Sequence, residues 1–232
     1  MSEPVPGPAP GAGGRERLGV FGGTFDPPHY GHLVAAEEAA EQLGLPQVLF
    51  VPTGQPPHKR GEPVTAVHHR VRMTELAIAD NPRFVLSRVD VDRPGISYTA
   101  DTLALLRAAY GPDTELYFIC GMDMLASFLT WHEPARVIAQ CQLVAVTRPS
   151  YPLVDLAQLE QALPAARGRI HVLRVPGIDI SSTELAERVA ALAPVPGSLV
   201  FLTSGGSDSV DTALKIARRY WQLVGRPERS VL

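Results

Sequence analysis

Long hydrophobic runs are absent from this sequence. No stretch approaches the ~20 consecutive apolar residues that a membrane-spanning helix requires, so we expect no membrane partner. The hydrophobic share of 45% beside 19% charged residues is that of an ordinary globular protein and argues against a disordered chain. With 232 residues, the chain should form one main domain with room for a small appendage.

The sequence also contains few cysteines and has no net positive charge. The two cysteines, Cys120 and Cys141, stand in apolar segments without CxxC spacing, which favours buried reduced thiols over a disulfide or a metal site. The net charge of -3 argues against a nucleic-acid-binding surface, although a local cationic pocket for phosphates is compatible with it. We therefore expect a small-molecule ligand and no metal-ligating cluster.

An apolar segment of the kind found in signal peptides is missing from the first 16 residues, which are rich in Pro, Gly and Ala. They are expected to form a flexible tail, and the protein is expected to be cytoplasmic. The main domain should span residues 17–193. Residues 194–232 predict a separate strand-helix segment.

The pattern of apolar residues predicts a doubly wound, Rossmann-like α/β fold, with a parallel sheet covered by helices on both faces. Strands are expected at 18–21, 48–52, 84–89, 115–120, 142–147 and 170–174. Helices are expected at 31–43, with Gly44 as its C-terminal stop, and at 67–79, 99–109, 156–163 and about 181–191. Because ligands of such folds bind beyond the carboxyl ends of the strands, functional motifs should lie in the loops that follow strands.

The turn after the first predicted strand carries the densest motif, GGTFDPPHYGH at residues 22–32. Its two glycines let backbone amides approach a ligand closely. His29 and His32 flank a helix start, where free amides and the macrodipole favour an anion, and two imidazoles there can stabilise charge on departing pyrophosphate. A lone histidine is more often an ordinary surface or core residue, and a metal site would need a third ligand that the motif lacks.

This motif resembles the strand-loop-helix signature of the HxGH nucleotidyltransferase superfamily. That superfamily includes nicotinate and nicotinamide mononucleotide adenylyltransferases, pantetheine phosphate adenylyltransferases and cytidylyltransferases. The resemblance implies that His29 and His32 are catalytic. It also implies that ATP is bound by His32 together with Gly22, Gly23, Thr24 and Phe25.

Later segments resemble nicotinate mononucleotide adenylyltransferases in particular. They are VPTGQPPHK at 51–59, HRVRM at 69–73, SYTADTL at 97–103, FICGMDML at 118–125, and a downstream Trp131 and Arg148. The resemblance implies that Gly121 and Asp123 bind ATP, and that the mononucleotide is bound by Lys59, Tyr98, Thr99, Trp131 and Arg148. From the residues alone, a solvated loop lysine, a helix-capping Thr99 and a Trp131 used only for packing are equally ordinary interpretations.

A second phosphate cradle is predicted near the end of the main domain, at Ile180, Ser181, Ser182 and Thr183. It resembles the ISSTxxR motif that holds ATP. The arginine of that motif falls on Ala186 here, and the nearest cation, Arg188, lies roughly 200° around a helix from that position. Loss of an arginine clamp can weaken phosphoryl transfer, so activity could be reduced.

The activity implied is adenylyl transfer from ATP to nicotinate mononucleotide, with Mg²⁺ carried by the ATP phosphates; a homo-oligomer is compatible with the sequence. The sequence does not fix the preference for nicotinate over nicotinamide mononucleotide. A catalytically impaired nucleotide-binding protein is the first alternative. Residues 198–232 also resemble part of class III pyridoxal-phosphate aminotransferases, so a cofactor-binding fragment is a weaker alternative; aminotransferase activity is not expected, because the Schiff-base lysine region is missing.

Overall fold

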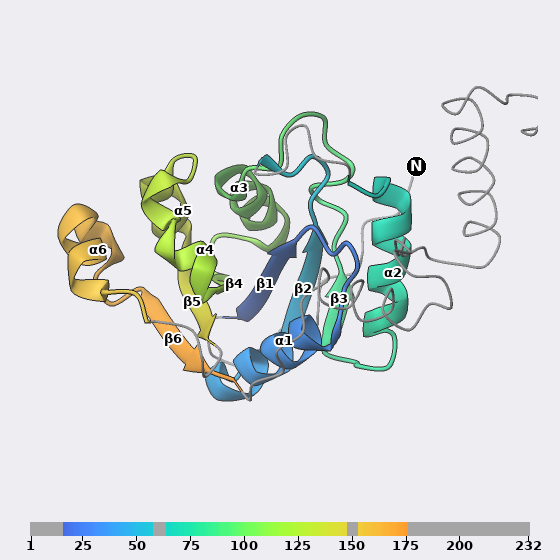
Figure 1. The fold of residues 1–232 in the computed structure, drawn as a ribbon, viewed down its shortest axis with the longest axis horizontal. Helices are drawn as coiled ribbons and strands as arrows, with labels where there is room; N and C mark the ends of the chain where they lie inside the picture. The colour runs from blue at the N-terminus through green and yellow to red at the C-terminus, as the bar shows by residue number, and fades with distance from the viewer. Residues whose placement is uncertain (1–15, 58–63, 148–152, 176–232) are drawn as a thin grey trace, which may run out of the picture.

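The computed structural model describes residues 16–57, 64–147 and 153–175. Six parallel strands form one sheet in the order β3-β2-β1-β4-β5-β6 (Figure 1). Their bounds are β1 Arg17–Gly23, β2 Gln47–Pro52, β3 Phe84–Leu86, β4 Glu115–Gly121, β5 Cys141–Thr147 and β6 Ile170–Arg174. The strand order reverses between β1 and β4, which confirms the predicted doubly wound fold.

Helices cover both faces of this sheet (Figure 1). They are α1 Tyr30–Leu43, α2 Val67–Ile78, α3 Thr99–Tyr110, α4 Met122–Ala126, α5 Pro134–Gln140 and α6 Leu156–Ala162, with 3₁₀ turns at Phe128–Thr130 and Pro164–Ala166. Buried residues of α1 and α2 share one apolar cluster, and those of α3, α5 and α6 share another. None of the helices in the described ranges is long and apolar enough to span a bilayer.

The two apolar clusters arise from the alternation of side chains along each strand. In β2, Val48 and Phe50 join the cluster under α1, whereas Leu49 and Val51 join the cluster under α3 and α5. Successive side chains of a strand point to opposite faces, so a continuous apolar run fills both layers. This is why the predicted strands read as unbroken runs of large aliphatic and aromatic residues.

Most predicted boundaries agree with the structure. Gly44 ends α1 in a left-handed conformation, with φ 62°, as expected of a glycine helix stop. The third strand is shorter than predicted: it ends at Leu86, because the chain then turns, with Val91 N–H donating to Arg88 O at 2.9 Å. Thr99 is the first helical residue of α3 and Tyr98 is the N-cap, so a capping role for Thr99 is wrong.

The short helices α4 and α5, of five and seven residues, were not predicted. Each is too short to show a clear helical period in the sequence. The helix expected at 181–191 and the strand-helix segment at 194–232 lie outside the described residues.

Candidate functional site

The predicted motifs that the structure describes gather at the carboxyl edge of the sheet. The loops after β1, β2, β3 and β4 all leave the sheet there, on both sides of the point where the strand order reverses. In open α/β sheets this crevice is where ligands bind. We therefore built the candidate site from these four loops.

Gly22 and Gly23 end β1 and have no room for a side chain. A Cβ on Gly22 would stand 3.2 Å from the Phe118 ring, and a Cβ on Gly23 would stand 2.9 Å from the Phe25 ring. The glycines thus serve the packing of the protein itself, in addition to any approach of backbone amides to a ligand. Phe25 is buried and has a positive φ of 49°, a strained conformation for a bulky residue that its surroundings must hold in place.

His29 and His32 lie together at the start of α1. His29 is the N-cap residue, and its backbone N–H donates to Nδ1 of His32 at 3.1 Å. The two rings are 3.7 Å apart between centroids, and the Phe25 ring packs edge-on against His32 at 5.2 Å. Because Nδ1 of His32 accepts a hydrogen bond, its neutral imidazole carries the proton on Nε2.

Arg70, on α2, ties the loop after β1 to the loop after β2. Its side chain is 1% exposed and donates to the backbone oxygens of Thr24 at 2.7 Å, Thr65 at 2.9 Å and Gly54 at 3.2 Å. Burial lowers the pKa of Arg70, and the nearby Asp26 carboxylate opposes that effect. Arg70 remains charged, since arginine starts far above neutral pH. It is a positioning residue that the sequence analysis left without a role.

Ser97 ties the same β2 loop to the start of α3. Its hydroxyl oxygen accepts from the backbone N–H groups of Gly54 at 2.9 Å and Gln55 at 3.2 Å. Gly54 must be a glycine for steric reasons, because a Cβ there would stand 2.6 Å from the carbonyl oxygen of Asp90. The serine of the SYTADTL segment therefore holds the loop after β2 in place.

A buried ion pair stabilises the chain at the start of α3. Arg93 Nε lies 2.9 Å from Asp90 Oδ1, and Thr102 donates its hydroxyl to the same oxygen at 2.6 Å. The guanidinium also donates to the carbonyl oxygen of Ile96 at 2.9 Å. These bonds satisfy a carboxylate that is 3% exposed, and they fix the chain just before Tyr98.

A cavity of about 410 Å³ opens beside this helix start. It is lined by Pro57, Ser97, Tyr98, Thr99, Thr130, Trp131, His132 and Glu133. The structure thus brings Tyr98 and Thr99 close to Trp131, as predicted, although Trp131 lies more than 30 positions further along the chain. Trp131 is 8% exposed and packs edge-on against Phe118 and Phe128, so the packing interpretation also holds. Its indole Nε1 is buried and has no hydrogen-bond partner among the residues that the structure describes.

His132 also faces this cavity, although no motif singled it out. Its ring stacks on Tyr98, with centroids 4.1 Å apart and an interplanar angle of 27°. The only sequence signal for it is its place next to Trp131.

Gly121 and Asp123 stand where β4 passes into α4. Gly121 is the N-cap of α4, and Asp123 is exposed in its first turn. A Cβ at Gly121 would collide with the Asp123 carboxylate oxygen. The carboxylate therefore folds back over the end of β4, at the crevice where the strand order reverses.

Other predicted site residues lie outside the described residues: Lys59, Arg148, Ile180, Ser181, Ser182 and Thr183, together with Ala186 and Arg188. Their roles stay predictions. Within the described ranges, no group of three or more His, Cys, Asp or Glu side chains is arranged to hold a metal ion.

Cys120 and Cys141 are buried and not disulfide-bonded, as expected. Burial raises the pKa of Cys120 well above its usual range and that of Cys141 to about 12. Both thiols are therefore protonated and unreactive at neutral pH.

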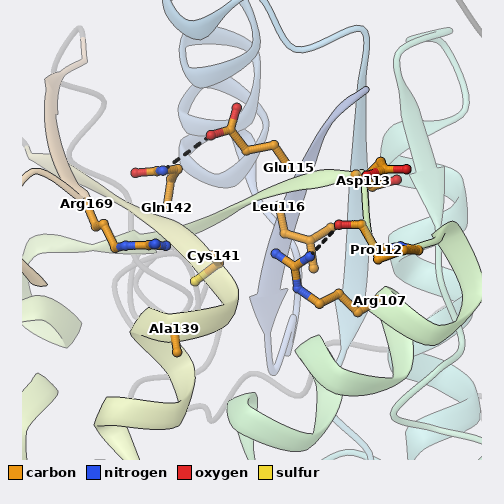
Figure 2. A pocket seen from close by; sticks show the side chains of 10 residues that line it. Arg107, Pro112, Asp113, Glu115, Leu116, Ala139, Cys141, Gln142 and Arg169 are labelled. Carbon is orange, nitrogen blue, oxygen red and sulfur yellow. Dashed lines mark hydrogen bonds between the residues drawn. The ribbon is translucent and has the colours of Figure 1, made fainter. Parts of the chain in front are cut away.

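A second cavity, of about 270 Å³, lies around Cys141 at the opposite edge of the sheet, where β4 and β5 begin (Figure 2). Arg107 occupies one wall and donates to the backbone oxygens of Pro112 at 3.0 Å and Gln140 at 2.6 Å. The Gln142 amide donates to Glu115 at 3.3 Å on the other side. These side chains connect α3 and α5 to the strand starts, far from the carboxyl-edge loops.

Comparison with known proteins gives consistent results. The sequence profile of the cytidylyltransferase-like family matches residues 20–188. Proteins of Moorella thermoacetica and Saccharopolyspora erythraea, each called "Probable nicotinate-nucleotide adenylyltransferase", are 47% and 50% identical to this chain. The first alignment covers 77% of this chain and 83% of the relative, and the second covers 78% and 82%.

Among solved structures, the nicotinic acid mononucleotide adenylyltransferase of Plasmodium falciparum complexed with NaAD has a TM-score of 0.61 over 74% of this chain and 83% of its own. At 18% identity this likeness supports the fold alone. The resemblance of residues 198–232 to a pyridoxal-phosphate aminotransferase is not borne out, since the matched family ends at residue 188 and these relatives are of another class.

Proposed function

The chain belongs to the cytidylyltransferase-like family, and we propose that within it the chain is a nicotinate-nucleotide adenylyltransferase that joins ATP to nicotinate mononucleotide. The products are nicotinate adenine dinucleotide, the deamido precursor of NAD, and diphosphate. The proposal rests on one edge of the sheet, which carries both the helix start with His29 and His32 and the cavity lined by Tyr98 and Trp131, called the aromatic cavity below. The chain is also 47 to 50% identical to relatives of that name.

The reaction needs no nucleophile from the protein. A phosphate oxygen of nicotinate mononucleotide forms a bond to the α-phosphorus of ATP, and the bond from that phosphorus to the bridging oxygen breaks. Diphosphate leaves with the electron pair. Negative charge grows on the departing group, so donors that already point at it lower the barrier.

His29 and His32 supply such donors in our proposal. The bond from His29 N–H to Nδ1 orients the His32 ring. In the reaction, the Nε2–H of His32 would donate to a phosphate oxygen. The positive end of α1, whose first turn contains no acidic residue, favours the same anion. The backbone from Gly22 to Phe25 would lie along ATP, with Asp123 on its nucleoside side.

The aromatic cavity would receive the pyridine ring. A pyridinium is cationic, and the faces of Trp131 and Tyr98 suit a flat cation. Thr99, at the start of α3, would face the ring substituent. From sequence, we add Lys59 and Arg148 on the mononucleotide and the segment from Ile180 to Thr183 as a second phosphate cradle.

Mg²⁺ fits this site as a companion of ATP. It commonly keeps several waters and is held through substrate phosphates with few protein ligands, so it would enter the site with ATP. When bound, it would neutralise charge on the phosphate oxygens.

Formation of the dinucleotide and release of diphosphate from ATP, Mg²⁺ and nicotinate mononucleotide test the proposal directly. The His32→Ala protein should lose about 100- to 1000-fold in kcat, as other removals of a transition-state donor do. The matched control is His68→Ala, which changes an exposed histidine on α2 and should leave kcat unchanged. Absence of dinucleotide from the wild-type protein with either mononucleotide would overturn the proposal.

A second candidate, a nucleotide-binding protein with impaired turnover, is favoured by one observation: Ala186 replaces the expected arginine. It predicts that calorimetry detects ATP binding by a wild-type protein that forms no dinucleotide. Restoring the cation with Ala186→Arg should then raise turnover.

A further inference from the structure

His132 is one of the polar residues that line the cavity beside Tyr98 and Trp131, together with Ser97, Thr99, Thr130 and Glu133. We propose that His132 is a specificity-determining residue, whose protonated ring favours a carboxylate over a carboxamide on the pyridine ring of the mononucleotide. This inference rests on the proposed function and deepens it, because the two mononucleotides differ only in that substituent.

The position of the His132 ring is well defined. It stacks on the Tyr98 ring at 4.1 Å, and Tyr98 is itself the N-cap of α3. On the other side, Glu133 adopts a left-handed backbone with φ 52°, and Pro134 begins α5 directly after it. The imidazole is therefore held at the cavity wall between two helix starts, while its side chain stays 47% exposed and open to protonation.

The charged groups around His132 leave its cation usable by a ligand. Its Nε2 lies 3.5 Å from the Glu133 carboxylate, but Arg136 NH1 lies closer to that carboxylate, at 2.7 Å. Arg136 also pairs with Asp101 of α3 at 2.9 Å. The arginine thus pairs with both carboxylates. Within the described part of the chain, the Tyr98 ring, with its titratable hydroxyl, also packs against the His132 ring.

A carboxylate in this cavity would meet two features that favour negative charge. One is the protonated imidazole, and the other is the N-terminal end of the 12-residue helix α3 at Tyr98 and Thr99. A carboxamide carries no charge and gains nothing from protonation of His132. The preference for the carboxylate should therefore be largest at low pH and should decline as the imidazole loses its proton.

The experiment measures kcat/KM for nicotinate and nicotinamide mononucleotide from about pH 6 to about pH 8.5. In the wild-type protein, the ratio of the two kcat/KM values should fall across this range. His132→Gln should lower the ratio at about pH 6 by about fivefold, the effect of a half-exposed charge pair, and should make it independent of pH.

Two further variants make the outcome decisive. His132→Lys keeps a positive charge and should preserve the preference at high pH. His68→Gln, which removes an exposed histidine of α2, should behave as wild type. An active His132→Gln protein with an unchanged ratio and pH profile would overturn the inference, whereas a wild-type protein without product from either substrate would overturn the proposed function itself.

Discussion

Replacing Arg70 with methionine should destabilise the protein by about 2 to 5 kcal/mol and lower kcat/KM as well. The arginine side chain is 1% exposed and holds the backbone oxygens of Thr24, Gly54 and Thr65. Methionine has a similar length but no donor. The three oxygens would lose their partner at once, and the loops after β1 and β2 would lose their connection.

The magnitude follows from opposing contributions. Each hydrogen bond from a charged donor contributes about 1.5 to 3 kcal/mol, and the bond to Gly54, at 3.2 Å, is the weakest of the three. Burying the guanidinium costs several kcal/mol, as the lowered pKa of Arg70 indicates, and methionine avoids that cost. The difference leaves a net loss of a few kcal/mol.

Urea unfolding and steady-state kinetics of the Arg70→Met protein test this reasoning. Arg72→Met is the matched control, because Arg72 lies on the same helix and makes only an exposed pair with Glu75 at 3.0 Å. The control should change the free energy of unfolding by no more than about 0.5 kcal/mol. If Arg70→Met were as stable as this control, the assigned role of the buried guanidinium would be refuted; lost stability with unchanged kcat/KM would refute its role in placing the loops.

Two further predictions concern Gly54 and the two buried cysteines. Gly54→Ala should cost about 1 to 3 kcal/mol in urea unfolding and raise the KM for the mononucleotide, because its Cβ would meet the Asp90 carbonyl oxygen at 2.6 Å; an unchanged KM would show that the loop adapts freely. Cys120 and Cys141 should resist a thiol reagent in the native protein at about pH 8 and react once urea unfolds it. Burial raises the pKa of both thiols above the value of about 8.5 of an unfolded cysteine, so the native state holds these protons longer and the free energy of unfolding should fall above about pH 9; rapid native labelling would contradict this.

The sequence alone was sufficient to predict the layers of the fold and the edge of the sheet at which the candidate site lies. Strand runs such as residues 48–52 are apolar on both faces, and Gly44 ends a helix as a left-handed glycine should. Once the sheet is parallel, its carboxyl edge collects the loops that follow strands, so the grouping of Tyr98, Thr99 and Trp131 required no further information.

The roles of individual polar residues in the site were not predictable in the same way. Local patterns report on neighbours a few positions apart, whereas the bond from Arg70 to Thr24 spans 46 residues and that from Gly54 to Ser97 spans 43. The pattern also left capping open as an alternative role for Thr99, although Tyr98 holds that position. His132 gave no signal because a single histidine beside a tryptophan has many ordinary explanations.

These long-range bonds connect the two halves of the candidate site. Arg70 joins the histidine-bearing loop at Thr24 to the second loop at Gly54, and Ser97 joins that loop to the helix start at Tyr98, where the aromatic cavity begins. If the proposed reaction is in-line transfer, the distance between the phosphate cradle and the pyridine cavity must be held closely, since small errors in alignment slow such reactions strongly. A buried arginine that bonds to both loops meets that requirement. Substitution of Arg70 should therefore affect both substrates, whereas substitution of His132 should affect the mononucleotide alone.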